Sequence, residues 1–250
     1  MARSGFEVQK VTVEALFLRE IRTRFGKFRL GYLWAILEPS AHLLILLGIF
    51  GYIMHRTMPD ISFPVFLLNG LIPFFIFSSI SKRSVSAIEA NQGLFNYRPV
   101  KPIDTIIARA LLETLIYVSV YILLMLIVRM AGEYFEITNF LQLVLTCSVG
   151  LIFMVVGKTF PEMQKVLPIL LKPLYFISCI MFPLHSIPKQ YWSYLLWNPL
   201  VHVVELSREA VMPGYISEGV SLNYLAMFTL ITLFIGLALY RTREEAMLTS

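Results

Sequence analysis

Two pairs of polar side chains stand one helical turn apart in the apolar parts of this chain. Glu38 and His42 lie in LEPSAH, residues 37–42, with Pro39 between them. Arg109 and Glu113 have the same i,i+4 spacing, which brings side chains together on a helix surface. A charged side chain within a membrane is costly and marks a functional site by default. We interpret Glu38 and His42 either as such a site or as a pair near the membrane interface, and Arg109 with Glu113 as a structural pair.

The sequence offers no complete motif for a nucleotide, a metal ion or a catalytic triad. GKT at 157–159 resembles the end of a phosphate loop, but that loop needs a glycine where Ile152 stands. The four histidines are scattered, and neither HExxH nor GxSxG occurs. We therefore expect this chain to bind no cofactor or metal ion and not to be an enzyme. A membrane enzyme of lipid or glycan synthesis is kept as an alternative.

An aromatic segment lies at residues 184–221. Four aromatic residues fall within seven positions and are followed by Asn198–Pro199: Tyr191, Trp192, Tyr194 and Trp197. Such rings form belts at membrane interfaces, and they also stack on the apolar faces of sugars. After Pro199 the sequence VHVVELSREAV, with Glu205 and Arg208, has apolar residues at helical spacing. We expect two short helices that enter the outer leaflet and return.

The composition places these residues in a membrane protein. The chain has 250 residues, of which 57% are hydrophobic and 15% charged, with a mean hydropathy of +0.72. A span needs about 20 mainly apolar residues, and we predict six, at 34–54, 63–81, 105–130, 138–157, 166–183 and 222–240. The fourth is barely long enough. The fifth contains Pro168, Lys172 and Pro173, so we expect it to be kinked or broken. The prediction is a single all-α membrane domain.

The distribution of Lys and Arg predicts the orientation. Most of the 21 basic residues fall in residues 1–33, 82–110, 158–165 and the C-terminal tail, which six spans place on one face. The other face has only Arg56, Arg129, Lys189 and Arg208. Basic loops remain in the cytoplasm, so both termini are predicted to be cytoplasmic. The net charge of +5 is explained by topology, and a nucleic-acid partner is not indicated.

Two segments that flank spans have patterns of their own. In residues 13–34, Phe17, Ile21, Phe25 and Phe28 recur at helical spacing while basic residues occupy other faces. We predict an amphipathic helix with its basic side toward anionic head groups, or else a plain topological anchor. In residues 91–113 two prolines flank Val100–Lys101 and are expected to interrupt the helix, after which Asp104 is predicted to N-cap the third span.

The motifs together resemble a known family. LREIRTRFGKFRLGYLWAILEPSAHL at 18–43, NQGLFNYRPVKPIDTIIARALLE at 91–113 and SCIMFPLHSIP with LLWNPLVHVVELSR at 178–208 resemble the permease subunits of type-2 ABC exporters, in particular the capsular polysaccharide branch. The resemblance covers nearly the whole chain. Many members have Ser-Gly where this chain has Ser178–Cys179, and the fourth span is short for the family.

The resemblance implies a homodimer in the bacterial inner membrane. Each protomer would dock a separate nucleotide-binding subunit that holds ATP and Mg. A lipid-linked, anionic capsular polysaccharide would pass to a periplasmic adaptor and an outer-membrane channel. An exporter of another amphiphile, such as a drug or a lipid-linked O-antigen, is the alternative.

The resemblance also assigns roles to residues of this chain. The cytoplasmic gate and interface helix would include Arg19, Arg22, Arg24, Phe25, Leu30 and Gly31. The element that couples to the ATPase would include Asn96, Tyr97, Arg98, Lys101 and Asp104. The periplasmic gate, with possible polymer contacts, would include Tyr191, Trp192, Trp197, Asn198, Pro199, Glu205 and Arg208.

Overall fold

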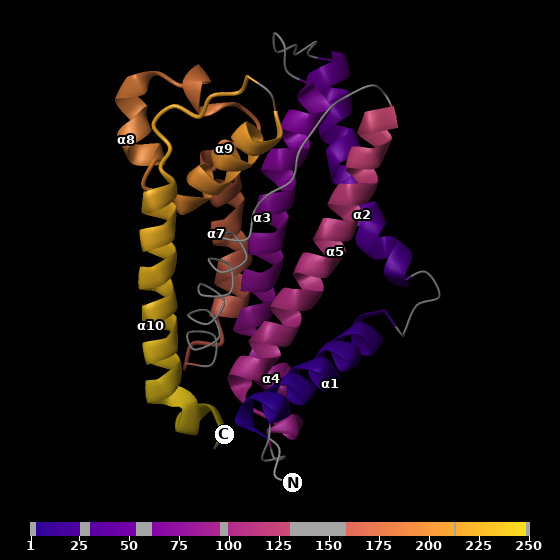
Figure 1. Ribbon diagram of the computed structural model, residues 1–250, viewed down its shortest axis with the longest axis vertical. Coiled ribbons are helices and arrows are strands. Elements are labelled where there is room, and N and C mark those ends of the chain that lie inside the picture. Colours follow the sequence, from indigo (N-terminus) through magenta and orange to yellow (C-terminus); the bar gives the residue numbers. More distant parts are fainter. Residues whose placement is uncertain are drawn as a thin grey trace.

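The protein is a bundle of helices in the computed structural model, which describes residues 4–25, 31–53, 62–95, 100–130, 159–212 and 214–248 (Figure 1). No β-strand occurs within these ranges. Three helices are long and apolar enough to cross a membrane: α3 (Phe63–Val85), α5 (Pro102–Met130) and α10 (Leu222–Leu248). α2 (Gly31–Leu46) contributes to a shorter apolar helix over Ile36–Phe50.

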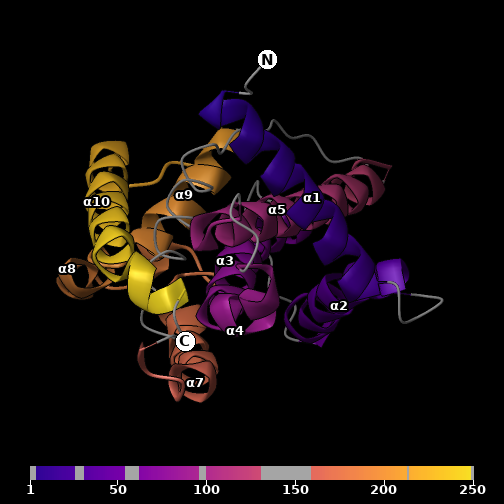
Figure 2. The same ribbon diagram turned by 90° about the horizontal axis from the view of Figure 1, so that it is seen from below.

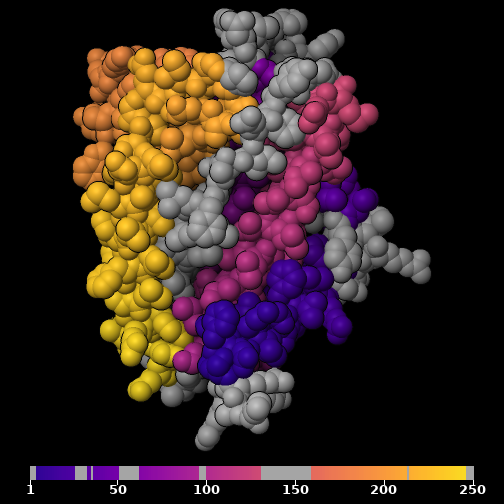
Figure 3. Space-filling model, viewed as in Figure 1, coloured from indigo at the N-terminus to yellow at the C-terminus, as the bar shows by residue number. Residues whose placement is uncertain are grey.

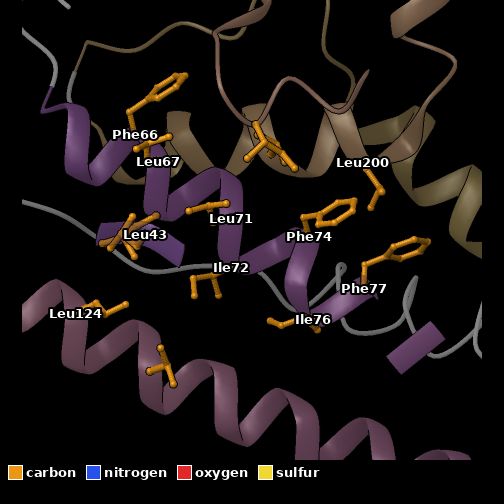
Figure 4. Close-up of a cluster of buried hydrophobic side chains, with 14 of the residues drawn as sticks. Leu43, Phe66, Leu67, Leu71, Ile72, Phe74, Ile76, Phe77, Leu124 and Leu200 are labelled. Atoms are coloured by element: carbon orange, nitrogen blue, oxygen red, sulfur yellow. The ribbon is translucent and has the colours of Figure 1, made fainter. Parts of the chain in front are cut away.

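α3 is the central element of the bundle. In its most apolar stretch 83% of the residues are buried, because α5, α7 (Met163–Ile177) and α9 (Pro199–Val211) all pack against it. A helix that is hydrophobic all round is stable only when it is surrounded. Figure 4 shows this core, in which Leu43 of α2, Leu124 of α5 and Leu200 of α9 surround the phenylalanines and leucines of α3.

α5 and α10 have the opposite character. Only 28% and 22% of the residues in their apolar stretches are buried, and large side chains such as Leu115, Ile122, Leu230 and Phe234 are exposed. Exposed apolar area of this extent requires an apolar surrounding. The two helices therefore have faces suited to lipid or to another subunit.

The boundaries of the predicted spans need correction. The first helix begins at Gly31 and continues beyond Leu46 as a π-helix, η1 (Leu47–Ile53). The second and sixth run past their predicted ends, to Val85 and Leu248, and the third begins three residues early. The predicted fourth span, 138–157, lies outside the described residues.

The fifth predicted span differs most from its prediction. Of the two expected alternatives, a break at the prolines is wrong, because α7 passes through Pro168 and Pro173 without interruption, and a kink stays a prediction. The helix ends at Ile177, six residues before the predicted end, and Cys179 then adopts a positive φ of 55°. That left-handed geometry favours glycine, so a glycine at this position would relieve the strain.

The N-terminal helix α1 (Gly5–Phe25) lies across one end of the bundle and packs on α5 (Figures 1 and 2). It starts eight residues before the predicted segment. The C-terminal part of α10 reaches the same end of the bundle, whereas α8 (Trp192–Leu195) and α9 are at the opposite end. In Figure 3 the side chains of α1 cover the lower part of α5. Within the predicted segment 184–221 the structure has the short helices α8 and α9, and their re-entry into the outer leaflet stays a prediction.

Candidate functional site

A cavity of about 720 Å³ lies in the half of the bundle nearer to α1. Its walls come from the middle of α2, the second half of α3 and most of α7, with single residues from α1 and α5. The lining residues are Arg24, Glu38, His42, Phe74, Phe75, Ser78, Ser79, Lys82, Arg83, Ser86, Tyr117, Pro168, Leu171, Lys172, Tyr175 and Phe176. The predicted pair Glu38 and His42 is thus brought to one site, together with residues that the sequence did not single out.

One group of lining residues is cationic. Arg24 lies in the last turn of α1, Lys82 and Arg83 lie in the last turn of α3, and Lys172 belongs to the apolar helix α7. Basic residues in the last turn of a helix interact favourably with the negative end of the helix dipole. Glu38 is the acidic residue among the lining residues. The cavity therefore attracts anions.

A second group is aromatic. The His42 and Phe75 rings meet edge to face at 5.2 Å between centroids, as do the Phe74 and Tyr175 rings. The His42 Nε2 atom lies 3.3 Å from the Tyr175 hydroxyl. Packed rings with free faces and hydroxyls suit a ligand that presents both apolar C–H faces and polar groups.

The pairing predicted for Arg109 and Glu113 is wrong. Glu113 is 1% exposed, and its Oε1 atom accepts from Arg24 and forms an ion pair with Arg83, whose Nε atom lies 2.6 Å away. Its Oε2 atom accepts from the Ser79 hydroxyl at 2.7 Å. The two residues take different partners because α1 and α3 cover this face of α5 and supply charges across the helix contacts.

Arg109 instead connects α5 to α1 and α3. Its Nε donates to Glu20 at 2.8 Å, and its Nη1 donates to the Arg83 carbonyl at 2.6 Å. Arg19 of the same helix α1 donates to the Asn91 side chain of α4 (Ala87–Asn91). The predicted orientation of the basic side of α1 toward head groups is therefore wrong for Arg19 and Arg24, which face the protein, whereas Arg22 is exposed. Phe25 is buried.

Asp104 is the third residue of α5, so the prediction that it is the N-cap is wrong, although its carboxylate does act at the start of the helix. The helix begins with Pro102 at N1, and the Asp104 Oδ2 atom accepts from the backbone N–H of Lys101 at 3.0 Å. Gln9 of α1 donates to the other carboxylate oxygen at 3.1 Å. Asn96, Tyr97, Arg98 and Leu30 lie outside the described residues, and Gly31 is the first residue of α2.

Residues 12–212 match the model of the ABC-2 type transporter family. The chain belongs to this family. It is 94% identical over 258 residues to the polysialic acid transport protein KpsM of Escherichia coli, with full coverage of both chains. It is 27% identical over 247 residues to the capsule polysaccharide export inner-membrane protein BexB of Haemophilus influenzae, covering 96% of this chain and 93% of the relative. The O-antigen export system permease protein RfbA of Myxococcus xanthus is 24% identical over 241 residues, 92% of each chain.

These matches confirm the family that the sequence motifs indicated. The cavity of this ABC-2 type transporter includes residues that sequence reasoning missed as site residues, chiefly Lys82, Arg83, Lys172 and Tyr175. Lys172 carried a usable signal, since a lysine inside an apolar helix is rarely accidental. Lys82 and Arg83 were interpreted only as topology charges. Within the described residues, no group of three His, Cys, Asp or Glu side chains could hold a metal ion.

At the opposite end of this ABC-2 type transporter the predicted outer residues separate into two kinds. Tyr191 and Trp197 are exposed, together with Tyr194. Trp192 is buried and donates from its indole N–H to the Ile187 carbonyl at 2.8 Å. Exposed rings are available to lipid or a ligand, whereas Trp192 ties the start of α8 to Ile187 in the preceding segment.

Asn198 and Pro199 begin α9. The Asn198 Oδ1 atom accepts from the Leu200 N–H at 3.0 Å, and Pro199 occupies the first helical position. The Asn198 Nδ2 atom donates to the Ser178 hydroxyl at 3.0 Å, which ties α9 to the end of α7. This element is therefore a helix start and a tether.

Glu205 and Arg208 form a buried cluster with exposures of 1% and 0%. The Arg208 Nη1 atom donates to Glu205 at 2.9 Å and to the Cys179 carbonyl at 2.8 Å, while Nη2 donates to the Ile180 carbonyl at 2.7 Å. The guanidinium also lies 3.6 Å from the centre of the Phe66 ring. A charge removed from water in this way is tolerated because it is fully paired.

Tyr215 completes this cluster. Its hydroxyl donates to the second Glu205 oxygen at 2.6 Å. Burial, and then the Glu205 charge, raise the pKa of the Tyr215 phenol, so it remains a protonated donor at neutral pH. The cluster joins α9 to α3 and to the end of α7.

Proposed function

We propose that this chain is the membrane-spanning permease of an exporter that moves an anionic capsular polysaccharide across the bacterial inner membrane. Membership of the ABC-2 type transporter family supports a transport role. Three relatives that align over nearly their whole length are named for transport or export of polysaccharides or O-antigen. The 94% identity to the polysialic acid transport protein supports polysialic acid as the polymer.

The observation that carries the proposal is the cavity. It combines four cationic side chains with a cluster of aromatic rings and with the Ser78 and Tyr117 hydroxyls. Polysialic acid has one carboxylate on each sugar, so it matches the cations, while its hydroxyls and ring faces match the other groups. A cavity that binds neutral or cationic drugs would not be expected to carry four cationic side chains.

The source of energy in this proposal is a separate ATPase. The sequence contains no complete phosphate loop, so ATP and Mg would be bound by two partner subunits that dock at the end of the bundle carrying α1 and α4. Lys101, Asp104 and the segment at 96–98 remain our proposed coupling element. Its support is that α4 and the start of α5 contact α1 through Asn91 and Asp104.

The assembly and orientation are also proposals. The exposed apolar faces of α5 and α10 would meet lipid and a second copy of the chain, giving a homodimer. The excess of Lys and Arg at the end with α1 supports cytoplasmic termini. The outer segment, with its exposed Tyr191 and Trp197, would then face the periplasm, the adaptor and the outer-membrane channel.

The RfbA match favours a lipid-linked O-antigen as the second candidate substrate. The two polymers differ in charge, because capsular polysialic acid is anionic at every sugar and many O-antigens are neutral. The cationic residues of the cavity favour the capsule.

The test removes cavity charge without removing charge elsewhere. The double variant Lys82→Gln, Lys172→Gln should export polysaccharide at least about tenfold more slowly, because a hydrogen bond to a charged group contributes about 1.5–3 kcal/mol. Export is measured as surface polymer against polymer retained in the cytoplasm, at equal membrane protein level. Lys10→Gln, on the exposed side of α1, is the matched control and should export normally.

Normal surface polymer in the double variant would refute the cavity as the substrate site. The identity of the retained polymer, acidic capsule or O-antigen, separates the two candidate substrates.

A further inference from the structure

Glu113 binds two arginines through one oxygen atom. Its Oε1 accepts from Arg24 and forms an ion pair with Arg83, while Oε2 accepts from Ser79. The carboxylate is 1% exposed, whereas the Arg24 and Arg83 side chains are 20% and 36% exposed and line the cavity. The carboxylate thus lies behind two guanidinium groups that face the site.

This arrangement leaves binding capacity on the cavity side. Two guanidinium groups and one carboxylate carry a surplus positive charge. Each guanidinium has five N–H donors in a planar fork, and the contacts to Glu113 use only Nη1 of Arg24 and Nε of Arg83. An anion in the cavity can therefore compete with Glu113 for the same groups.

Arg24 is the partner that Glu113 can lose. Without it, the carboxylate still has Arg83 at 2.6 Å and Ser79 at 2.7 Å, so no buried charge is left unpaired. Arg83 and Ser79 both belong to α3. If a ligand replaced Glu113 as the partner of Arg83, the bond from Ser79 would still join α3 to α5, so no helix would be released. Exchange at Arg24 would release the end of a different helix, α1.

The other side-chain contacts of α1 limit what is released. Gln9 bonds Asp104, Arg19 bonds Asn91 and Glu20 bonds Arg109, and all three lie before the last turn of the helix. Arg24 is the ion-pairing residue of that last turn. Its release removes the ion pair between this turn and α5, and any movement that follows also carries Phe25, which is buried in the same turn, while the rest of the helix stays attached to α4 and α5.

We propose that Glu113 is a positioning residue that holds Arg24 while no glycan occupies the cavity. A carboxylate of the glycan then replaces Glu113 as the partner of Arg24, and this exchange detaches the last turn of α1 from α5. This rests on the proposed function, since it assigns an anionic glycan to the cavity. The ligand shifts the position of α1 because its affinity for Arg24 is higher when Arg24 is separated from Glu113 than when the two are paired. By reciprocity, removing the Glu113 charge both releases α1 and raises glycan affinity.

The experiment measures spin-label distances in the full-length chain, purified with its ATPase partner. Cys147 is replaced by Ser, and Cys179 is buried away from labels. Labels at Thr23→Cys and Leu111→Cys report the end of α1 against α5, and labels at Lys10→Cys and Leu111→Cys report its beginning. A polysialic acid oligomer should lengthen the first distance and leave the second unchanged, and a neutral dextran oligomer should change neither.

Two variants provide the matched comparison. Glu113→Gln should show the longer 23–111 distance before any oligomer is added, with affinity raised on the order of tenfold. Glu38→Gln removes the same charge from the cavity wall, but Glu38 makes none of the ion pairs found in the described part of the chain. Glu38→Gln should therefore keep the short distance until oligomer is added.

The outcomes separate the two proposals. Binding of the oligomer with an unchanged 23–111 distance would overturn the role of Glu113 and leave the proposed function standing. No binding at all would overturn both. If Glu113→Gln does not fold, the measurement on the labelled chain with native Glu113 still decides.

Discussion

Glu113 and Glu205 are both 1% exposed and both bind arginine, but they are built into the protein differently. The partners of Glu205 are themselves buried: Arg208 is fully enclosed and donates its other N–H groups to the Cys179 and Ile180 carbonyls. The partners of Glu113 are arginines with part of their surface on a cavity. One cluster uses its donors internally, and the other keeps donors available.

The difference shows that burial of a carboxylate does not by itself define its role. What matters is where the remaining hydrogen-bonding capacity of its cations is directed. In the Glu205 cluster every direction is filled by backbone or aromatic groups, so the cluster fixes α9 on α3 and α7. In the Glu113 cluster one direction is open to the cavity, so the same chemistry can respond to a ligand.

The largest expected difference in the free energy of unfolding is between variants that remove one arginine from each cluster. Arg208→Ala should lower the free energy of unfolding by about 3–5 kcal/mol, because Glu205 is left buried without its cation. Arg24→Ala should cost about 1 kcal/mol or less, since Glu113 keeps Arg83 and Ser79. The measurement is thermal unfolding of the full-length chain in detergent. Equal losses in the two variants would contradict the distinction between a closed and an open cluster.

A smaller effect tests how tightly the cluster of Glu205, Arg208 and Tyr215 is packed. A Cβ atom at Gly70 would lie 2.8 Å from the Arg208 Nη2 atom and 2.9 Å from the Ile180 carbonyl oxygen. Because the carbonyl belongs to the backbone, Gly70→Ala should cost about 1–3 kcal/mol. Gly93→Ala is the control, since a Cβ there meets no atom within 4 Å. A neutral Gly70→Ala would show that the cluster is loose.

The smallest effect tests the tether from α9 to α7. Asn198→Ala removes the N-cap of α9 and the bond to Ser178, and should cost about 1 kcal/mol. Asn198→Asp keeps the capping acceptor and should recover most of the loss. Asn223→Ala, at an exposed asparagine near the start of α10, should be neutral. If Asn198→Asp is as unstable as Asn198→Ala, the bond to Ser178 rather than the cap fixes α9.

The sequence predicted those features that depend on local pattern. Long apolar runs marked α3, α5 and α10, and Asp104 was expected near the start of α5 because a carboxylate favours a helix N-terminus. The bond between Glu113 and Arg24 was not predictable, since these residues are 89 positions apart and the spacing of Arg109 to Glu113 suggested a nearer partner. Tertiary packing decided which charges meet.

The cavity was only half predictable for the same reason. Glu38 and His42 were noticed because polar residues are unusual in an apolar helix. Lys82 and Arg83 were counted as basic residues of a loop, and a charge count does not say which way a side chain points. Trp192 and Trp197 looked alike in sequence, yet packing buries one and exposes the other.

The ties between α1 and α5 also set the order in which the chain is completed during synthesis. Glu20 and Arg24 bond residues that follow them by 89 positions. At about 5–20 residues per second, the ribosome needs roughly 4–18 s to produce those partners. Throughout that interval the first helix has left the ribosome while its binding surface does not yet exist. Glu20 and Arg24 therefore gain these partners only after the start of α5 has been made.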